Sequence, residues 1–121
     1  MPRMLIVEDE RDIADCLVDF FSARGFSVIS AFSGEEALEH LLDEQEAADV
    51  ILLDILLPGL SGIEVLKRAH ALRPRAKIVM VTSVDQEDIR EQAFHYGASG
   101  YVIKPFDFST ATWRTVFHGA A

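Results

Sequence analysis

The sequence predicts an α/β fold in which helices cover both faces of a parallel β-sheet. Five short aliphatic or β-branched segments recur along the 121 residues, and segments with helical spacing of apolar residues separate them. The strand-like segments are almost continuously apolar, as is typical of strands that are buried on both faces. A regular alternation of strand and helix favours a parallel sheet between two layers of helices.

The predicted strands are rich in Val, Ile and Leu, which suits a buried sheet. Each is bounded by polar or turn-forming residues, so the strand–helix unit repeats along the whole chain. In order, the strand sequences are RMLIV from Arg3, FSVISA from Phe26, DVILLD from Asp49, KIVMVT from Lys77 and SGYVIK from Ser99.

The segments between the strands have the apolar spacing of amphipathic helices. Tetrapeptides SGEE, SGIE and DQED each place a capping side chain three residues before an acidic one, as in a capping box. These boxes predict helix starts at Ser33, Ser61 and Asp85, and helix ends are indicated near Gly25, Pro74 and Gly97. The expected inward positions are Ile13, Leu17, Phe20 and Phe21 in the first helix and Ile63, Leu66 and Ala69 in the third.

The last predicted helix, within FDFSTATWRTVFHGAA, has an irregular apolar pattern. Its inward register from Phe108 passes through small or β-branched residues, namely Ala111, Thr112 and Thr115. The larger apolar residues fall on a neighbouring stripe, where we expect the aromatic ones to be exposed. These are Trp113, Val116 and Phe117.

Composition limits the architecture and the class of partner. Half of the residues are apolar, which suits one domain over residues 1–121 with one hydrophobic core, without a linker or internal repeat. No apolar run is long enough to span a bilayer and no signal-peptide pattern is present, so we expect a cytoplasmic protein without a membrane partner. The 20 acidic and 11 basic residues give a net charge of −9, which argues against direct binding of nucleic acid.

Neither the cysteine nor the histidines suggest a chemical site. The single Cys16 has no disulfide partner, and we expect it to pack on the buried face of the first helix. The histidines have no metal-ligand spacing and are expected at the surface or at helix ends. They are His40, His70, His95 and His118.

Polar residues stand at the carboxyl ends of four predicted strands. In open parallel α/β sheets the functional crevice lies beyond those ends. Carboxylates gathered at one rim repel one another, and a divalent cation relieves the repulsion. Oxygen ligands without His or Cys favour Mg²⁺ over Zn²⁺. The residues are Glu8 and Asp9 after the first strand, Asp54 after the third, Thr82 and Ser83 after the fourth, and Lys104 with Pro105 after the fifth.

This set of groups favours phosphoryl transfer onto Asp54. A cation and a lysine neutralise the transferring oxygens, while the carboxylate oxygen is the nucleophile. A phosphohydrolase with an aspartyl phosphate intermediate would want a second carboxylate two residues later, and Leu56 stands there. The sequence has no GxGxxG, GxxxxGK[ST] or GxSxG motif. We therefore expect a protein that is itself the phosphoryl acceptor rather than a turnover enzyme.

The motifs resemble the receiver domain of bacterial two-component response regulators, of the chemotaxis-regulator type. The resemblance rests on the acidic pair in LIVEDE, on DILLPGLSG with Pro and Gly four and eight residues after the Asp, on VTS, and on GYVIKPF. It extends from Met4 to about Phe108. It implies a flavodoxin-like (βα)₅ doubly wound parallel sheet with strand order 2-1-3-4-5.

The resemblance also implies a signalling switch in a phosphorelay. A histidine kinase, a phosphotransfer protein or a small phosphodonor would phosphorylate Asp54. This would change the surface formed by helix 4, strand 5 and helix 5, which would bind an effector or a second copy. By position, Asp9, Asp54 and the Leu56 backbone carbonyl would hold Mg²⁺, Glu8 would help through a water, Thr82 and Lys104 would contact the phosphoryl group, and Tyr101 would be the switch aromatic.

Two positions beside the acceptor depart from the family pattern. Leu56 and Val84 are apolar where relatives often carry polar residues. We therefore expect slow loss of the phosphoryl group. Apart from its own phosphorylation, this autodephosphorylation is the only reaction that we expect the chain to catalyse.

Two other functions compete with the switch. One is an adaptor that keeps the fold but works without phosphorylation, which the intact set of Asp9, Asp54, Thr82 and Lys104 argues against. The other is a small phosphohydrolase, which Leu56 disfavours. The sequence does not name the cognate kinase, the pathway, the output partner or the oligomeric state, nor whether the chain stands alone or is part of a longer regulator.

Overall fold

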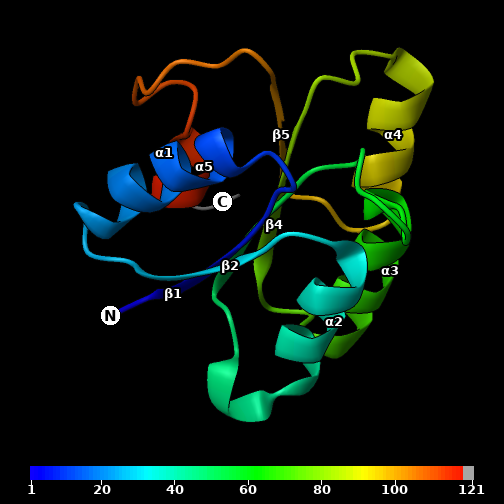
Figure 1. Ribbon diagram of the computed structural model, residues 1–121. Coiled ribbons are helices and arrows are strands. Elements are labelled where there is room, and N and C mark those ends of the chain that lie inside the picture. Colours follow the sequence, from blue (N-terminus) through cyan, green and yellow to red (C-terminus); the bar gives the residue numbers. More distant parts are fainter. Residues whose placement is uncertain (119–121) are drawn as a thin grey trace.

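The computed structural model describes residues 1–118 and has a five-stranded parallel sheet (Figure 1). Neighbouring strands follow the order β2-β1-β3-β4-β5, which confirms the expected topology. In this order the chain reverses direction across the sheet beside β1, so β1 and β3 end at the switch point. The strands are β1 (Arg3–Val7), β2 (Ser27–Ala31), β3 (Val50–Leu53), β4 (Lys77–Thr82) and β5 (Gly100–Ile103).

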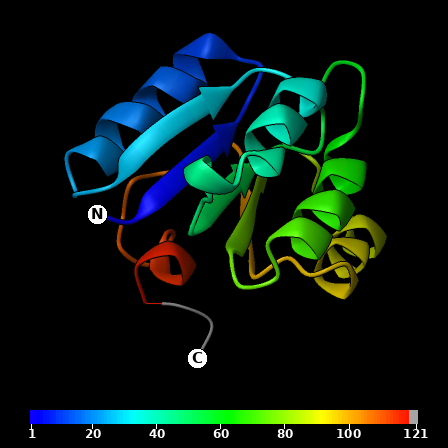
Figure 2. The same cartoon turned by 90° about the horizontal axis from the view of Figure 1, so that it is seen from below.

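Helices cover both faces of the sheet. Figure 2 shows α1 and α5 on one side and α2, α3 and α4 on the other. A short 3₁₀ turn, η1 (Glu44–Glu46), follows α2. The helices are α1 (Arg11–Ser22), α2 (Gly34–Leu42), α3 (Gly62–Leu72), α4 (Glu87–His95) and α5 (Arg114–His118).

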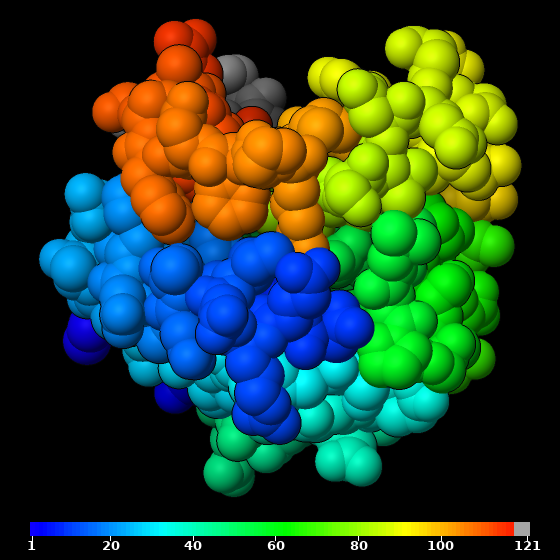
Figure 3. Space-filling view, turned by 45° about the horizontal axis from the view of Figure 1, so that its top comes forward, coloured from blue at the N-terminus to red at the C-terminus, as the bar shows by residue number. Residues whose placement is uncertain are grey.

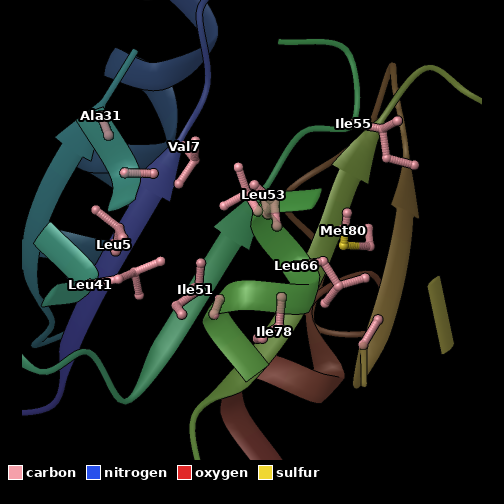
Figure 4. Packing of buried hydrophobic residues seen from close by; sticks show 14 of the residues in the cluster. Leu5, Val7, Ala31, Leu41, Ile51, Leu53, Ile55, Leu66, Ile78 and Met80 are labelled. Carbon is pink, nitrogen blue, oxygen red and sulfur yellow. The ribbon is translucent and has the colours of Figure 1, made fainter. Parts of the chain in front are cut away.

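The sheet separates two hydrophobic cores. One core lies between the sheet and α2, α3 and α4, where Leu53, Leu66 and Met80 pack (Figure 4). The other lies against α1 and α5 and includes Phe21 and Trp113. All four residues of β3 are buried, because both of its faces meet a core. Burial on both faces explains the continuous apolar runs in the sequence.

Two of the three predicted helix starts are confirmed, each with its serine as the N-cap. The Ser33 hydroxyl accepts the Glu36 N–H at 3.1 Å, and the Ser61 hydroxyl accepts the Glu64 N–H at 3.4 Å. The third prediction is wrong, because α4 begins after Gln86 and has no side-chain cap. Asp85 lies one residue too early to reach the free N–H groups of the first turn.

Cys16 is exposed, so its expected burial is wrong. The residues of α1 that are buried are Ala14, Leu17 and Phe21, which share one face at helical spacing. Cys16 is adjacent to Leu17 and is turned by about 100° from it around the helix axis, which carries it off that face.

The predicted register of the last helix is also wrong. Trp113 is 1% exposed and Val116 is 3% exposed, whereas Ala111 is exposed and Phe108 is 41% exposed. Helix α5 begins only at Arg114, so helical periodicity does not apply from Phe108 onward.

Hydrogen bonds to Asp107 explain why the side chain of Trp113 points into the core. The Asp107 backbone carbonyl accepts the Trp113 indole N–H at 2.8 Å, and the Asp107 side chain accepts the Ser109 N–H at 3.0 Å and the Thr112 hydroxyl at 2.6 Å. These bonds fold the segment before α5 into turns and direct the indole into the α1-side core. The hydrogen bonds from Thr112 and Ser109 lower the pKa of Asp107 from 3.8 to about 2.

We predict that Thr112→Val raises the pKa of Asp107 toward its ordinary value. Valine keeps the shape of threonine but cannot donate a hydrogen bond to the carboxylate. The ¹³C shift of the Asp107 carboxyl carbon, followed against pH in both proteins, measures this. A midpoint near pH 2 in the variant as well would show that the Thr112 hydroxyl does not set the pKa.

Candidate functional site

The predicted polar residues meet at the carboxyl edge of the sheet. Figure 3 shows this face, where the segment after β1 (blue) lies beside the loops that follow β3 (green), β4 (yellow-green) and β5 (orange). The buried polar residues of the described chain are all here: Glu8, Asp54 and Thr82. Each stands at or just beyond the end of its strand, as the parallel topology requires.

Lys104 connects the acidic residues. Its ammonium nitrogen lies 2.5 Å from Glu8 Oε1, 2.7 Å from Asp54 Oδ2 and 3.8 Å from Glu10 Oε1. The lysine side chain is only 10% exposed, and those of Glu8 and Asp54 are 2% and 4% exposed. Glu10 was missed by sequence reasoning, although the acidic run EDE that contains it was visible.

The buried charges at this site depend on one another. Burial raises the pKa of Glu8, the hydrogen bond from Lys104 opposes that rise, and the nearby Asp54 charge adds to it. For Lys104, burial acts to lower the pKa, but hydrogen bonds to Asp54 and Glu8 outweigh it and raise the pKa above the ordinary value. Lys104 therefore stays charged at neutral pH and compensates the carboxylates around it.

The acidic residues also fit a divalent cation. Glu8, Asp9 and Asp54 each offer a carboxylate oxygen, and these oxygens lie within 4.8 Å of one another. Asp9 is exposed, so one side of the cluster is open to water. An all-oxygen donor set with room for water suits Mg²⁺. The Leu56 N–H donates to Asp54 Oδ1 at 3.1 Å, which folds the loop after β3 back beside the carboxylate.

Thr82 and Tyr101 are joined through the loop after β4. Thr82 is fully buried, and its hydroxyl accepts the Val84 N–H at 3.3 Å. The Tyr101 hydroxyl donates to the Val84 carbonyl at 2.6 Å, and burial raises the pKa of Tyr101. The backbone of Val84 is thus held from both sides, by the end of β4 and by β5.

The two apolar residues that depart from the family pattern lie on either side of the site. Leu56 is 57% exposed, and Val84 is half-buried. Ser83 is exposed and lines an open hollow of about 500 Å³ between α1 and the segment after β5, which Lys104 also lines. This hollow, which sequence reasoning missed, leads from the surface to the lysine.

None of the three histidines whose side chains the structure describes lies at this edge of the sheet. His40 is half-buried and lies 2.7 Å from Glu46, on η1, while His70 and His95 are exposed. The side chain of His118 lies outside the described residues.

The chain matches the family model of the response regulator receiver domain over residues 4–113. The chain belongs to this family. Among its relatives, the receiver is 37% identical over 105 residues to the transcriptional regulatory protein DltR of Streptococcus agalactiae, covering 87% of this chain and 46% of that protein. It is 38% identical over 104 residues to the alkaline phosphatase synthesis transcriptional regulatory protein PhoP of Bacillus subtilis, covering 86% and 42%. The receiver thus spans less than half the length of these curated relatives.

Solved receiver structures have the same fold. A CheY-like receiver domain protein of Methanospirillum hungatei superposes on this receiver with a TM-score of 0.83 at 34% identity, covering 88% of this chain and 84% of that one. A Burkholderia pseudomallei response regulator, described with a phosphorylated aspartic acid, a calcium ion and citrate, superposes with a TM-score of 0.85 at 26% identity and covers 93% and 65%. No helix among residues 1–118 of this receiver is both long and apolar enough to cross a membrane.

Proposed function

We propose that this receiver is a phosphorylation-dependent signalling switch in which Asp54 accepts one phosphoryl group. The observation that carries the proposal is the buried cluster in which Lys104 contacts Asp54 and Glu8 at 2.7 and 2.5 Å. A buried lysine between carboxylates orients the acceptor oxygen and neutralises charge where a phosphoryl group would arrive.

Each residue of the cluster has a role in the transfer. A carboxylate oxygen of Asp54 attacks phosphorus, a new O–P bond forms, and the bond from phosphorus to the donor breaks with its electron pair going to the donor. Lys104 and the Thr82 hydroxyl contact the incoming oxygens. Asp9, Asp54 and the Leu56 carbonyl would hold Mg²⁺, with Glu8 acting through a water, and the ion when bound supplies further neutralisation.

The phosphoryl group would change the loop after β4. New acceptor oxygens beside Asp54 would draw the Thr82 hydroxyl toward them to accept its hydrogen, and that movement would weaken the bond in which the same hydroxyl now accepts the Val84 N–H. Because Val84 also bonds Tyr101, a shift of this loop is passed on to β5. We propose Thr82 and Tyr101 as the two switch residues.

Intact-mass measurement after incubation with acetyl phosphate, with and without Mg²⁺, tests the function. We expect one added phosphoryl group per chain with Mg²⁺ and none without it. No added mass in either condition would favour a phosphorylation-independent adaptor. Multiple turnover of a generic phosphomonoester would favour a phosphohydrolase.

The proposed partners follow from this role. A histidine kinase or a phosphotransfer protein would supply the phosphoryl group, and an effector or a second copy would read the changed surface. Because DltR and PhoP are named as transcriptional regulators, our expectation of no direct nucleic-acid partner concerns this chain alone and not a longer protein that contains it.

We propose that the output surface is formed by α4, β5 and α5 around Tyr101. Trp113, which we expected to be exposed there, is buried in the α1-side core, so it is not part of this surface. Phe94 on α4 is 42% exposed, and the Arg90 guanidinium lies 6.0 Å from its ring centre and 5.6 Å from that of Tyr101. Exposed aromatic and arginine side chains are enriched at protein interfaces.

Beryllofluoride with Mg²⁺, a stand-in for the phosphoryl group, is expected to alter hydrogen exchange in α4 and β5. The cause is the shift of the loop after β4, in which Val84 is bonded to Tyr101 of β5. Peptide-resolved exchange, with residues 37–48 as the internal reference, measures the change, and sedimentation velocity detects a dimer. Changes confined to the loops after β3 and β4, with unchanged sedimentation, would contradict this output surface.

The phosphorylated form should be long-lived. Hydrolysis requires a water that attacks phosphorus in line, and neither Leu56 nor Val84 can orient or polarise it. A positioned general acid or base typically raises the rate of such a reaction by 10²-fold or more, and neither residue can supply one. We predict that Leu56→Asn or Leu56→Glu shortens the half-life of the phosphorylated protein, measured by intact mass after removal of the phosphodonor. A wild-type half-life of seconds, or no change in either variant, would refute this.

A further inference from the structure

The loop between β3 and α3 is held locally only near its base. Its backbone bonds there join the Leu57 N–H to the Ile55 carbonyl at 3.1 Å and the Gly62 N–H to the same carbonyl at 2.9 Å. The Leu56 N–H to Asp54 Oδ1 bond completes this base. The tip of the loop, residues 58–60, extends beyond these bonds.

The tip is held by the first turn of α2. Glu35 Oε1 accepts the Leu60 N–H at 3.1 Å, across 25 residues of sequence. Gly59 has a φ of +71°, and a Cβ there would lie 2.5 Å from Glu35 Oε2. A Cβ on Gly34 would lie 2.6 Å from the Leu60 carbonyl oxygen. Two glycines therefore allow the close approach, and one carboxylate holds it.

The turn that carries Glu35 is itself fixed. The Glu36 N–H donates to the Ser33 hydroxyl at 3.1 Å, and Glu36 Oε2 in turn accepts the Phe32 N–H at 3.2 Å. These two bonds resemble a capping box, except that Glu36 accepts the N–H of Phe32, one residue before the N-cap, and they anchor the start of α2 to the end of β2. Figures 1 and 2 show α2 beside α3, the helix into which the loop runs. Glu35 is thus a short link between a fixed turn and the loop tip.

We infer that Glu35 is a positioning residue for the phosphorylation site, because it holds the tip of the loop whose Leu56 carbonyl would be a ligand of Mg²⁺ when the ion is bound. This inference rests on the proposed function. Glu35 is exposed, and exposed polar contacts contribute little to global stability. We therefore expect Glu35 to keep the loop ordered rather than to stabilise the whole fold. The loop must be fixed before a backbone carbonyl can act as a ligand.

Calorimetric titration of Mg²⁺ into the unphosphorylated protein tests the inference, with unfolding midpoints in urea measured in parallel. Loss of one solvent-exposed hydrogen bond is expected to weaken Mg²⁺ binding by roughly fivefold in Glu35→Ala, which corresponds to about 1 kcal/mol. Glu35→Gln keeps an acceptor oxygen for the Leu60 N–H and should bind nearly as the wild type does. Glu39→Ala is the matched control, because it removes the same charge from an exposed position one turn further along α2.

Several results would overturn the inference. Equal weakening in Glu35→Ala and Glu39→Ala, or in Glu35→Ala and Glu35→Gln, would show an effect of charge alone. Unchanged Mg²⁺ affinity in Glu35→Ala would show that the loop holds its shape without the link. A wild-type protein that binds Mg²⁺ but takes up no phosphoryl group from acetyl phosphate would instead overturn the proposed function, so the two failures are distinguishable.

Discussion

Asp54→Asn is expected to abolish phosphorylation while the protein stays folded. Asparagine keeps the shape of aspartate, and its amide is not a nucleophile toward phosphorus. The substitution removes one carboxylate from a crowded acidic cluster, so it relieves repulsion even as it replaces the 2.7 Å ion pair with Lys104 by a hydrogen bond to a neutral amide. Intact mass after acetyl phosphate with Mg²⁺ measures uptake, and circular dichroism measures folding.

Asp15→Asn is the control for this variant. Asp15 is exposed on α1, so its substitution removes the same charge without touching the cluster. We expect full labelling of Asp15→Asn and none of Asp54→Asn. Labelling of Asp54→Asn at the wild-type level would refute the assignment of the acceptor.

Lys104→Met is expected to destabilise the protein strongly at neutral pH. The side chain is 10% exposed and pairs with two carboxylates that are almost fully buried. Removing one partner of a buried ion pair typically costs about 3–5 kcal/mol, because the other charge stays buried without compensation. Methionine keeps the apolar volume of the stem, so the loss reports mainly the missing charge.

The destabilisation should depend on pH. Without the lysine, the pKa of Glu8, already raised by burial above 4.5, rises further. Above pH 4.5, Glu8 in the folded variant therefore keeps a proton that Glu8 in the unfolded chain has released. The free energy of unfolding of the variant then falls as the pH rises toward neutrality. Added Mg²⁺ should restore part of the loss, since it places positive charge in the same cluster.

Urea unfolding at several pH values, with and without Mg²⁺, measures this prediction. Lys67→Met is the control, because Lys67 is 43% exposed and its contact with Glu64 is a surface pair at 4.0 Å. Such pairs contribute about 1 kcal/mol or less. Equal losses in the two variants would show that the cluster does not depend on Lys104.

Local sequence patterns predicted a parallel sheet with polar residues at its carboxyl edge, whereas the strand order came from the family resemblance. Parallel strands bring their carboxyl ends to one edge, so Glu8, Asp54, Thr82 and Lys104 had to meet once the strand order was known. The sequence did not predict the ion pairs of Lys104 with Glu8 and Asp54. They depend on side-chain rotamers and burial, which strand positions alone do not specify.

The error at the last helix came from local hydrogen bonds that override helical periodicity. The Asp107 turn directs Trp113 into the core, and no helical register from Phe108 could show this. The link from Glu35 to Leu60 joins residues far apart in sequence, so no local pattern marks it. The glycines beside it, Gly34 and Gly59, were the available signal, but close approach is only one reason for a glycine.

Chemical localisation of the phosphoryl group tests the central claim most directly. After acetyl phosphate and Mg²⁺, borohydride reduction converts an aspartyl phosphate to homoserine, and peptide mass spectrometry then finds the modified position. We predict a single modification, at Asp54, which is lost when Mg²⁺ is chelated before the phosphodonor is added. Modification at Asp9, Glu8 or any other residue, with Asp54 unmodified, would contradict the account.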